Sequence, residues 1–275
     1  MLRNFLTGLL LTLAHFGVPA AQAQEAAINE NSTTFKQRVQ LLSVGQIPES
    51  PSWWYVVTHG MGGMSEGDRF DELAQAIKEA FPKSNVYLLN WTHDASISPW
   101  PWVVARRIDT VAELAISQLR QHSVDPAKVT LIGESLGNNV NALIAQRMGQ
   151  VAHILALNPA HELGGGGSLN LRAYSQTAWS FHSQSPYDTH LPVADRSILL
   201  NTPHDCNAIG QHTYGVAWLR TTLKNGDREW LQLEQVIPEG PSGMFDVAIS
   251  PDGELDWELA PRRHQSSFNT ELALD

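Results

Sequence analysis

Residues 129–137, Val-Thr-Leu-Ile-Gly-Glu-Ser-Leu-Gly, constrain the fold of this chain more than any other segment. The apolar run at 129–132 predicts a buried strand, and residues 140–148 have the spacing of a helix. The turn between them carries glycines two residues before and two residues after Ser135. Such glycines allow a strained turn that lifts the serine hydroxyl above the edge of a sheet. The segment therefore predicts a strand, a tight turn with a serine at its apex, and a helix.

A Gly-x-Ser-x-Gly sequence also occurs by chance, and a passive turn between a strand and a helix is the alternative interpretation. The placement of Ser135 on a strand–helix junction favours a nucleophile. Serine alone reacts poorly, because it needs a base within reach and a carboxylate that orients the base. The rest of the chain has to supply those partners.

Apolar strands and helical patterns alternate on both sides of this motif. Strand-like runs occur at 53–58, 86–91, 154–157, 178–181 and 197–200, and helical apolar spacing occurs at 70–81 and 103–119. Strands that alternate with crossover helices predict a mostly parallel sheet with helices on both faces. We therefore expect one α/β domain over residues 36–224.

The two ends of the chain differ from this domain. Residues 1–23 combine Arg3, a short apolar run and a final Ala-Gln-Ala, which is typical of a cleaved export signal. The run is shorter than the roughly 20 apolar residues that a membrane span needs. We expect a mature protein that is periplasmic or extracellular, has no integral membrane segment and begins with a flexible lead-in at 24–35.

The C-terminal extension, residues 225–275, predicts a β-hairpin. Strand-like residues 244–249 and 254–259 flank Ser-Pro-Asp-Gly at 250–253, which is a strong turn signal. Because about 50 residues can hardly bury a core of their own, we expect the hairpin to pack on the same domain.

Charge and cysteine content narrow the classes of partner. The chain has a formal net charge of −10, which argues against nucleic acid. Cys206 is the single cysteine, so an intramolecular disulfide is impossible and a structural zinc site is not expected. We expect no metal and no organic cofactor, and the sequence leaves the oligomeric state open.

The candidate base follows the last major strand, at 197–200. His212 opens a segment with helical apolar spacing, and a histidine just before a helix stands on a rigid element while its ring can reach the sheet edge. His204 is the second candidate. A histidine in a surface loop is the alternative role for either.

The segment that follows the strand at 53–58 resembles an oxyanion loop. It reads His59-Gly-Met-Gly-Gly63, and its glycines let backbone N–H groups turn inward. Two such groups are needed to hold the developing negative charge. We assign them to Leu136, directly after the serine, and to Met61, with Gly60 as the alternative. His59 is expected to hold the loop through hydrogen bonds.

Four motifs between residues 53 and 219 together resemble the pancreatic-lipase-like branch of the α/β-hydrolases. They are Val57-Thr-His-Gly60, Val86-Tyr-Leu-Leu-Asn-Trp91, Gly133-Glu-Ser-Leu-Gly137 and Ile154-Leu-Ala-Leu-Asn-Pro-Ala160. The resemblance implies the α/β-hydrolase fold and a carboxylic-ester hydrolase that acts on lipids or related acyl esters. The chain lacks the cysteines that frame the family's lid and its C-terminal sandwich domain, so colipase-style assembly is not implied.

The acid of the triad is where the chain departs from that family. The family has an aspartate where this chain has Asn158, and an amide cannot carry the negative charge that stabilises an imidazolium. Most α/β-hydrolases hold the acid one strand later. The strand at 178–182 leads there to Asp188, which we expect to be the triad acid. Asp195 and Asp205 are the alternatives.

A loop at residues 93–102 could cover the site. It carries Ile97, Trp100 and Trp102, whose large apolar side chains suit the mouth of an acyl pocket. The alternative is that they pack on the helix behind them.

The sequence thus predicts an exported serine esterase or lipase with Ser135, His212 and Asp188 as its triad and an acyl ester or lipid as its substrate. An acyltransferase with the same triad is one alternative. A non-catalytic lipid-binding relative with a decayed triad, suggested by Asn158, is the other.

Overall fold

The structure, a computed structural model, describes residues 38–66, 69–160, 169–183, 194–202, 208–226, 243–249 and 255–256. The predicted export signal and lead-in lie outside the described residues, as do His204, Asp188 and Asp205. Within the described ranges, no helix has both the length and the apolar character that crossing a membrane requires.

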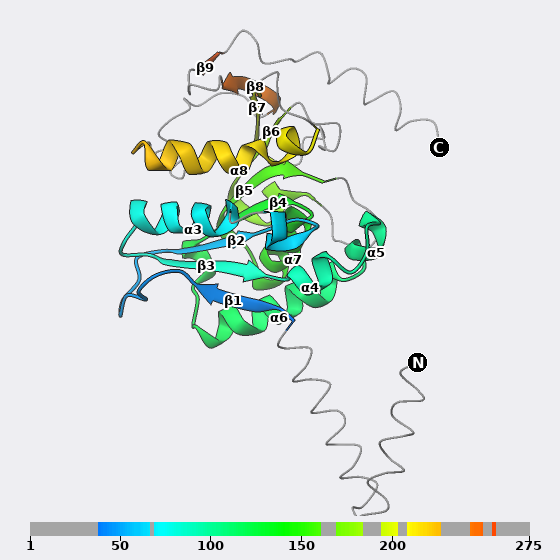
Figure 1. Cartoon of the computed structure of the whole chain (residues 1–275). Helices are drawn as coiled ribbons and strands as arrows, with labels where there is room; N and C mark the ends of the chain where they lie inside the picture. The colour runs from blue at the N-terminus through cyan, green and yellow to red at the C-terminus, as the bar shows by residue number, and fades with distance from the viewer. Residues whose placement is uncertain are drawn as a thin grey trace, which may run out of the picture.

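A single mixed sheet organises the described part of the chain (Figure 1). Its strands are β1 (Gln40–Ser43), β2 (Trp54–Thr58), β3 (Asn85–Asn90), β4 (Val129–Ser135), β5 (Val151–Pro159), β6 (Ser175–His182), β7 (Arg196–Leu200), β8 (Gly243–Ile249) and β9 (Leu255–Asp256). They lie in the order β1-β3-β2-β4-β5-β6-β7-β8-β9. The strands from β3 to β8 in this order run parallel, and the two edge strands run antiparallel to their neighbours.

Two pairs of long helices cover the two faces of the sheet. The pair α3 (Arg69–Ala80) and α8 (Ala208–Lys224) packs on one face, and the pair α6 (Ile108–Gln121) and α7 (Gly137–Met148) packs on the other. Short helices complete the described elements: η1 (Gly63–Glu66), α4 (Thr92–Ala95), α5 (Pro101–Ala105), η2 (Pro126–Lys128) and η3 (Leu171–Ala173).

Strand β2 shows why the sheet is buried on both sides. All its residues are buried, with Val56 in the core under α6 and α7 and with Tyr55 and Val57 in the core under α3 and α8. Successive side chains of a strand point to opposite faces, so a strand between two helical layers must be apolar throughout. The resulting architecture confirms the predicted α/β-hydrolase fold.

The structure corrects one predicted helix. Residues 103–119 were expected to form one continuous helix, but α5 ends at Ala105 and α6 begins at Ile108. At the junction the N–H of Arg107 bonds to the carbonyl of Val104, three residues back, and the α-helical ladder is interrupted. Apolar spacing continues across this break because it reports which side chains are buried and not whether the hydrogen-bond ladder is continuous.

The C-terminal hairpin extends the central sheet. Strands β8 and β9 pair antiparallel, with Ala248 opposite Asp256. Strand β8 also pairs in parallel with β7, with Leu199 opposite Ala248. The extension therefore adds strands to the sheet edge.

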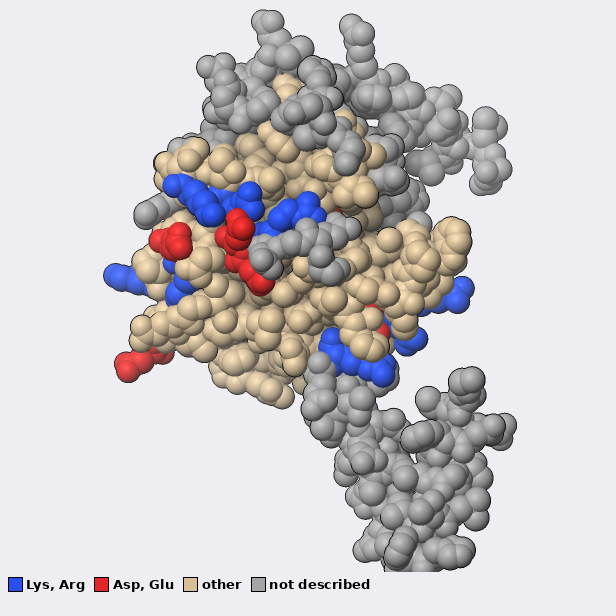
Figure 2. Space-filling model, viewed as in Figure 1, with Lys and Arg blue, Asp and Glu red and all other residues tan. Residues whose placement is uncertain are grey.

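Charged side chains of both signs lie side by side over α3 and α8 (Figure 2). Glu72 of α3 accepts a bond of 2.7 Å from Arg220 of α8, and the ammonium of Lys224 lies 3.6 Å away. These contacts cross the outer surface of the helix pair that carries His212.

Candidate active site

Ser135 lies at the carboxyl end of β4 in a strained backbone conformation. Its φ is 51°, in the left-handed region that a non-glycine residue seldom adopts. Strand β4 ends at this residue and α7 begins two residues later. A serine with positive φ between a strand and a helix is the geometry that a nucleophile elbow requires.

The two glycines of the motif are required by close packing. A Cβ at Gly133 would lie 2.6 Å from Oδ1 of Asn138, and one at Gly137 would lie 2.4 Å from the backbone oxygen of Thr58. Neither distance is possible for a real side chain. The turn therefore brings β4, α7 and β2 closer together than any other residue type would allow.

Buried asparagines of α7 anchor the elbow. The Nδ2 of Asn138 donates to the carbonyls of Ser135 and Leu157, both at 3.1 Å. The Oδ1 of Asn141 accepts a bond of 2.7 Å from the hydroxyl of Thr58. These bonds connect the serine turn to β5 on one side and to β2 on the other.

The loop after β2 packs directly against the serine. A Cβ built at Gly60 would lie 2.7 Å from the Cβ of Ser135. The N–H of Gly60 already donates to Oε2 of Glu134 at 3.1 Å. Among the described residues no hydrogen bond uses the N–H of Met61 or of Leu136. The N–H of Gly60 is thus already engaged by Glu134, and the assignment of the oxyanion donors to Met61 and Leu136 stays a prediction.

His59 holds this loop, as expected. Its Nε2 accepts the backbone N–H of Trp91 at 3.1 Å, so the proton resides on Nδ1, which donates to the carbonyl of Gly60 at 2.9 Å. The imidazole of His59 and the indole of Trp91 stack with their centroids 5.5 Å apart, and the indole N–H donates to the carbonyl of His59 at 2.7 Å. Burial lowers the pKa of His59 to about 4, so the ring is neutral at pH 7.

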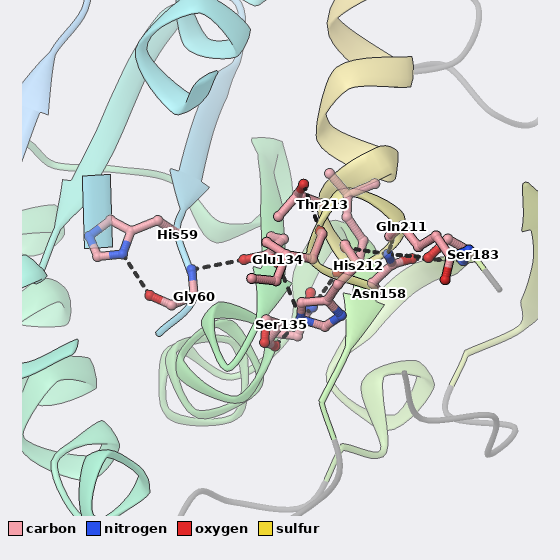
Figure 3. A network of polar contacts seen from close by, with 12 residues as sticks. His59, Gly60, Glu134, Ser135, Asn158, Ser183, Gln211, His212 and Thr213 are labelled. Carbon is pink, nitrogen blue, oxygen red and sulfur yellow. Dashed lines mark hydrogen bonds and ion pairs between the residues drawn. The ribbon is translucent and has the colours of Figure 1, made fainter. Parts of the chain in front are cut away.

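His212 lies in the second turn of α8, which corrects the expectation that it precedes the helix. The helix begins at Ala208, four residues before His212, whereas the residues that it buries start at Thr213. Figure 3 shows the imidazole near the end of β4. Its Nε2 lies 3.4 Å from Oε1 of Glu134, the residue before Ser135, and both side chains are largely buried. The fold thus brings the predicted base to the predicted nucleophile's immediate neighbour.

Asn158 has a specific structural role. Strand β5 has one extra residue at this point, since Glu134 pairs with Leu157 and Ser135 pairs with Pro159. Asn158 is that residue, with a φ of 42° and a fully buried side chain. Such a bulge re-aims one side chain out of the strand register.

The bulge directs the Asn158 amide toward α8 and the end of β6 (Figure 3). Its Nδ2 donates to the hydroxyl of Ser183 at 2.6 Å, to the carbonyl of Gln211 at 3.2 Å and to the carbonyl of His212. Its Oδ1 accepts the N–H of Ser183 at 2.9 Å. At the position where the resemblance in the sequence implied an acid, this chain therefore has a donor that holds the backbone of the candidate base.

The structure removes one alternative for the acid. Asp195 precedes β7 and exchanges hydrogen bonds with Ala178, through its own N–H at 2.9 Å and through Oδ2 at 2.8 Å. In the parallel register Ala178 is level with Ile154 and hence with Leu131, four residues before Ser135. Asp195 therefore lies away from the edge that carries the serine. The assignment of Asp188 stays a prediction.

The predicted pocket residues follow β3 at the same edge of the sheet as the serine. Ile97, Trp100 and Trp102 are 41%, 57% and 48% exposed. The indole rings of Trp100 and Trp102 stack at 5.0 Å with an angle of 25°. About half of each of these side chains is thus exposed at this edge of the sheet. The acyl pocket itself stays a prediction.

Sequence reasoning missed Glu134, whose carboxylate contacts both the oxyanion loop and the candidate base. The sequence did contain a signal for Glu134, because the residue between the first glycine and the serine of the motif always adjoins the candidate nucleophile in the chain. Within the described ranges, no group of three or more His, Cys, Asp or Glu side chains could hold a metal ion.

Comparison with known proteins gives the following likenesses. No family model and no curated protein match the chain. Est1E from Butyrivibrio proteoclasticus, solved with ferulic acid, shares 11% identity over 70% of this chain and 96% of its own, with a TM-score of 0.45. An esterase from Pyrobaculum calidifontis shares 13% identity over 80% and 98%, with a TM-score of 0.37. The thioesterase domain of NocB shares 18% identity over 48% of this chain and 51% of its own, with a TM-score of 0.32. The match therefore spans about half of that domain.

These solved structures are esterases and a thioesterase. Their low identities and TM-scores carry no residue role and no activity over to this chain.

Proposed function

We propose that this chain is a serine hydrolase of carboxylic esters, in which Ser135 is the nucleophile and His212 is the general base. The observation that carries the proposal is the elbow: Ser135 has a φ of 51° between two glycines at which no side chain fits. Strain of this kind persists only where the surrounding structure enforces it, and here it presents a hydroxyl at the carboxyl edge of the sheet.

The reaction that this arrangement supports is acyl transfer to water. His212 takes the hydroxyl proton while Oγ of Ser135 attacks the ester carbonyl, and the electron pair of the carbonyl bond moves to its oxygen. The N–H groups of Met61 and Leu136 stabilise that oxygen, and Leu136 adds the positive end of α7. The protonated imidazole then gives its proton to the leaving alcohol. Water attacks the acyl-enzyme by the same steps in reverse order.

The substrate class follows from the resemblance to the pancreatic-lipase-like branch and from the exposed apolar side chains at this edge. Trp100 and Trp102, in the segment that follows β3, offer a stacked aromatic surface. Such a surface suits an acyl chain. Together with the predicted export signal at residues 1–23, these features support an exported esterase or lipase that acts on lipids or related acyl esters.

The non-catalytic alternative loses its main support. It depended on Asn158 as a sign of a decayed triad, yet the amide of Asn158 makes hydrogen bonds that an aspartate could not donate. Its presence is explained by the position of α8.

A fluorophosphonate probe tests the proposal. The mature parent protein should be labelled, whereas Ser135→Ala should not be labelled and His212→Gln should be labelled far more slowly. Hydrolysis of p-nitrophenyl esters of increasing chain length then measures activity and acyl preference. Equal labelling of the parent and of Ser135→Ala, or no labelling of a folded parent, would contradict the proposed nucleophile.

A further inference from the structure

Glu134 occupies a position between the two halves of the candidate site. Its Oε2 accepts the N–H of Gly60 at 3.1 Å, and its Oε1 lies 3.4 Å from Nε2 of His212. One carboxylate thus contacts the oxyanion loop and the base at once (Figure 3). It stands next to Ser135 in the chain, on a strand that is held on both sides by parallel neighbours.

The carboxylate is buried, with its side chain 6% exposed, and the imidazole is 15% exposed. Removing a carboxylate from water is costly unless hydrogen bonds or an opposite charge compensate it. The N–H of Gly60 supplies one such bond. A positive charge on His212 would supply the other compensation, and the base acquires that charge when it takes the serine proton.

In the described part of the chain, the other candidate positions for the triad acid do not place a carboxylate against the imidazole of His212. Asn158 is an amide that bonds to the backbone of His212, not to its ring. Asp195 is bonded to Ala178 away from this edge. Glu134 is the acidic side chain that the described structure places against the imidazole.

We propose that Glu134 is a positioning residue that stabilises the His212 imidazolium during acyl transfer and at the same time fixes the oxyanion loop. This inference rests on the proposed function. A separation of 3.4 Å is long for a hydrogen bond, so the contact of Oε1 with Nε2 is an ion-pair contact. The proton moves from Oγ to Nε2 and then to the leaving alkoxide, and Glu134 stays ionised throughout.

The same contact selects the oxyanion donors. Because Glu134 uses the N–H of Gly60, the loop offers the next N–H, that of Met61, to the substrate. Loss of the carboxylate would therefore release both the imidazole and the loop.

Charged groups close to this pair are few in the described structure. Arg69 of α3 bonds at 2.6 Å to the hydroxyl of Thr213, the residue after His212. His59 lies in the oxyanion loop and is neutral at pH 7, because burial lowers its pKa to about 4. Glu134 is thus the negative charge that faces the imidazole, and its removal should favour the neutral ring.

The test is Glu134→Gln in the mature protein, with steady-state ester hydrolysis measured across pH. The side chain keeps its size and an oxygen for Gly60, but it loses its charge. We expect kcat to fall by about 100-fold or more, which is the range of general acid–base effects. KM should stay within about threefold of the parent, and the acid limb of the kcat/KM profile should move to lower pH.

Glu134→Asp is the second variant, and it covers the case in which the glutamine variant does not fold. It keeps the charge but is one methylene shorter, so we expect a smaller loss of kcat and an acid limb close to that of the parent. Glu113→Gln is the matched control, because Glu113 is an exposed partner of Arg147 at 2.7 Å and should leave the profile unchanged.

Three results overturn the inference. The first is a kcat of Glu134→Gln within threefold of the parent, above all if Asp188→Asn, run in parallel, loses activity. The second is an equal loss in the aspartate and glutamine variants with the acid limb in place, which indicates a purely structural role. The third is an unlabelled parent in the fluorophosphonate assay, which overturns the proposed function as well. A labelled parent with an active Glu134→Gln variant overturns this inference alone.

Discussion

The two halves of the candidate site are held in different ways. The oxyanion half, residues 58–64, is fixed by hydrogen bonds between the segments that follow two neighbouring strands, such as those of His59 with Trp91. The base half, His212 on α8, depends on side chains from distant elements, with Asn158 at its backbone and Glu134 at its ring. The oxyanion half is therefore held by the bonds of His59 with Trp91 in addition to the bond of Gly60 with Glu134, whereas the position of the base depends on a few specific polar contacts.

The largest effect expected from this contrast comes from Asn158→Asp. The substitution introduces the acid that the resemblance in the sequence implied at this position, but it places a carboxylate against the carbonyls of Gln211 and His212 in a fully buried place. We expect a loss of about 4 kcal/mol in the free energy of unfolding, typical of an uncompensated buried charge. We expect no gain in activity. Urea unfolding and ester hydrolysis measure the two quantities.

The control for that change is Asn225→Asp, at an exposed residue after α8, which should stay within about 0.5 kcal/mol of the parent. If Asn158→Asp were as stable as the parent and more active, the base half would not depend on the Asn158 amide, and the comparison of the two halves would be wrong.

Gly137→Ala tests the rigidity of the elbow. The new Cβ would lie 2.4 Å from the backbone oxygen of Thr58 and 2.7 Å from that of His59, and backbone atoms cannot move aside as a flexible side chain can. We expect a loss of about 3 kcal/mol in the free energy of unfolding, as for a forced overpacking of a core. Thermal or urea denaturation measures it.

Gly215→Ala is the matched control for the elbow. The nearest atom to its Cβ is 3.4 Å away, an ordinary contact, and the position is inside α8. Alanine there should be neutral or stabilising by about 0.5–1 kcal/mol, because glycine weakens a helix interior. Equal losses in the free energy of unfolding at Gly137 and Gly215 would mean that the close approach of Gly137 to the backbone of Thr58 is not the reason why the turn requires glycine.

The pH dependence of stability probes the oxyanion half. His59 has a pKa of about 4 in the folded protein, below its ordinary value of 6.5. Between these two values the unfolded chain binds more protons, so stability falls as the pH drops from about 6.5 to about 4. The full effect is at most on the order of 3 kcal/mol. Urea unfolding at several pH values should show a shallower acid slope for His59→Asn than for the parent.

His93→Gln is the control for this slope, because the ring of His93 is half exposed. It should reproduce the slope of the parent between pH 6.5 and 4. An unchanged slope in His59→Asn would show that the buried ring next to Trp91 does not set the acid sensitivity of the loop.

The same division separates what the sequence could predict from what it could not. The elbow and the oxyanion loop can be predicted from short local patterns. Gly133, Ser135 and Gly137 lie within five residues, and the two glycines of the motif indicate the tight turn that the backbone makes there. The alternating strands and helices likewise predicted the sheet and its two helical layers. Apolar spacing did not reveal the break at Arg107 or the early start of α8, because both depend on how the helices meet the sheet.

The contacts of the base half join residues far apart in the chain, and no local pattern reports them. Asn158 and His212 are 54 residues apart, and the residue numbers of Glu134 and His212 differ by 212 − 134 = 78. Asn158 therefore looked like a missing acid, although its bulged position makes it a donor to the backbone of the helix. Only the register of β4 against β5 gives that information.

The smallest expected effect comes from the exposed counterpart of the buried Glu134–His212 pair. Glu72 lies between Arg220 and Lys224 on the surface of α3 and α8, and its side chain is 48% exposed. Glu72→Gln should reduce the free energy of unfolding by less than about 0.5 kcal/mol, because water and salt weaken exposed ion pairs. Its kcat should equal that of the parent. Unfolding in low and in 1 M salt measures the difference, which should vanish at high salt.

A loss of several kcal/mol in Glu72→Gln would mean that the surface pairs, and not Asn158, hold α8 in place. The base half would then be fixed from outside the sheet. With the expected small loss, the position of His212 depends on the buried contacts at the ends of β4 and β5. These are the strands that carry Ser135 and the bulge, and the candidate nucleophile and the candidate base would then be held by the same two neighbouring strands.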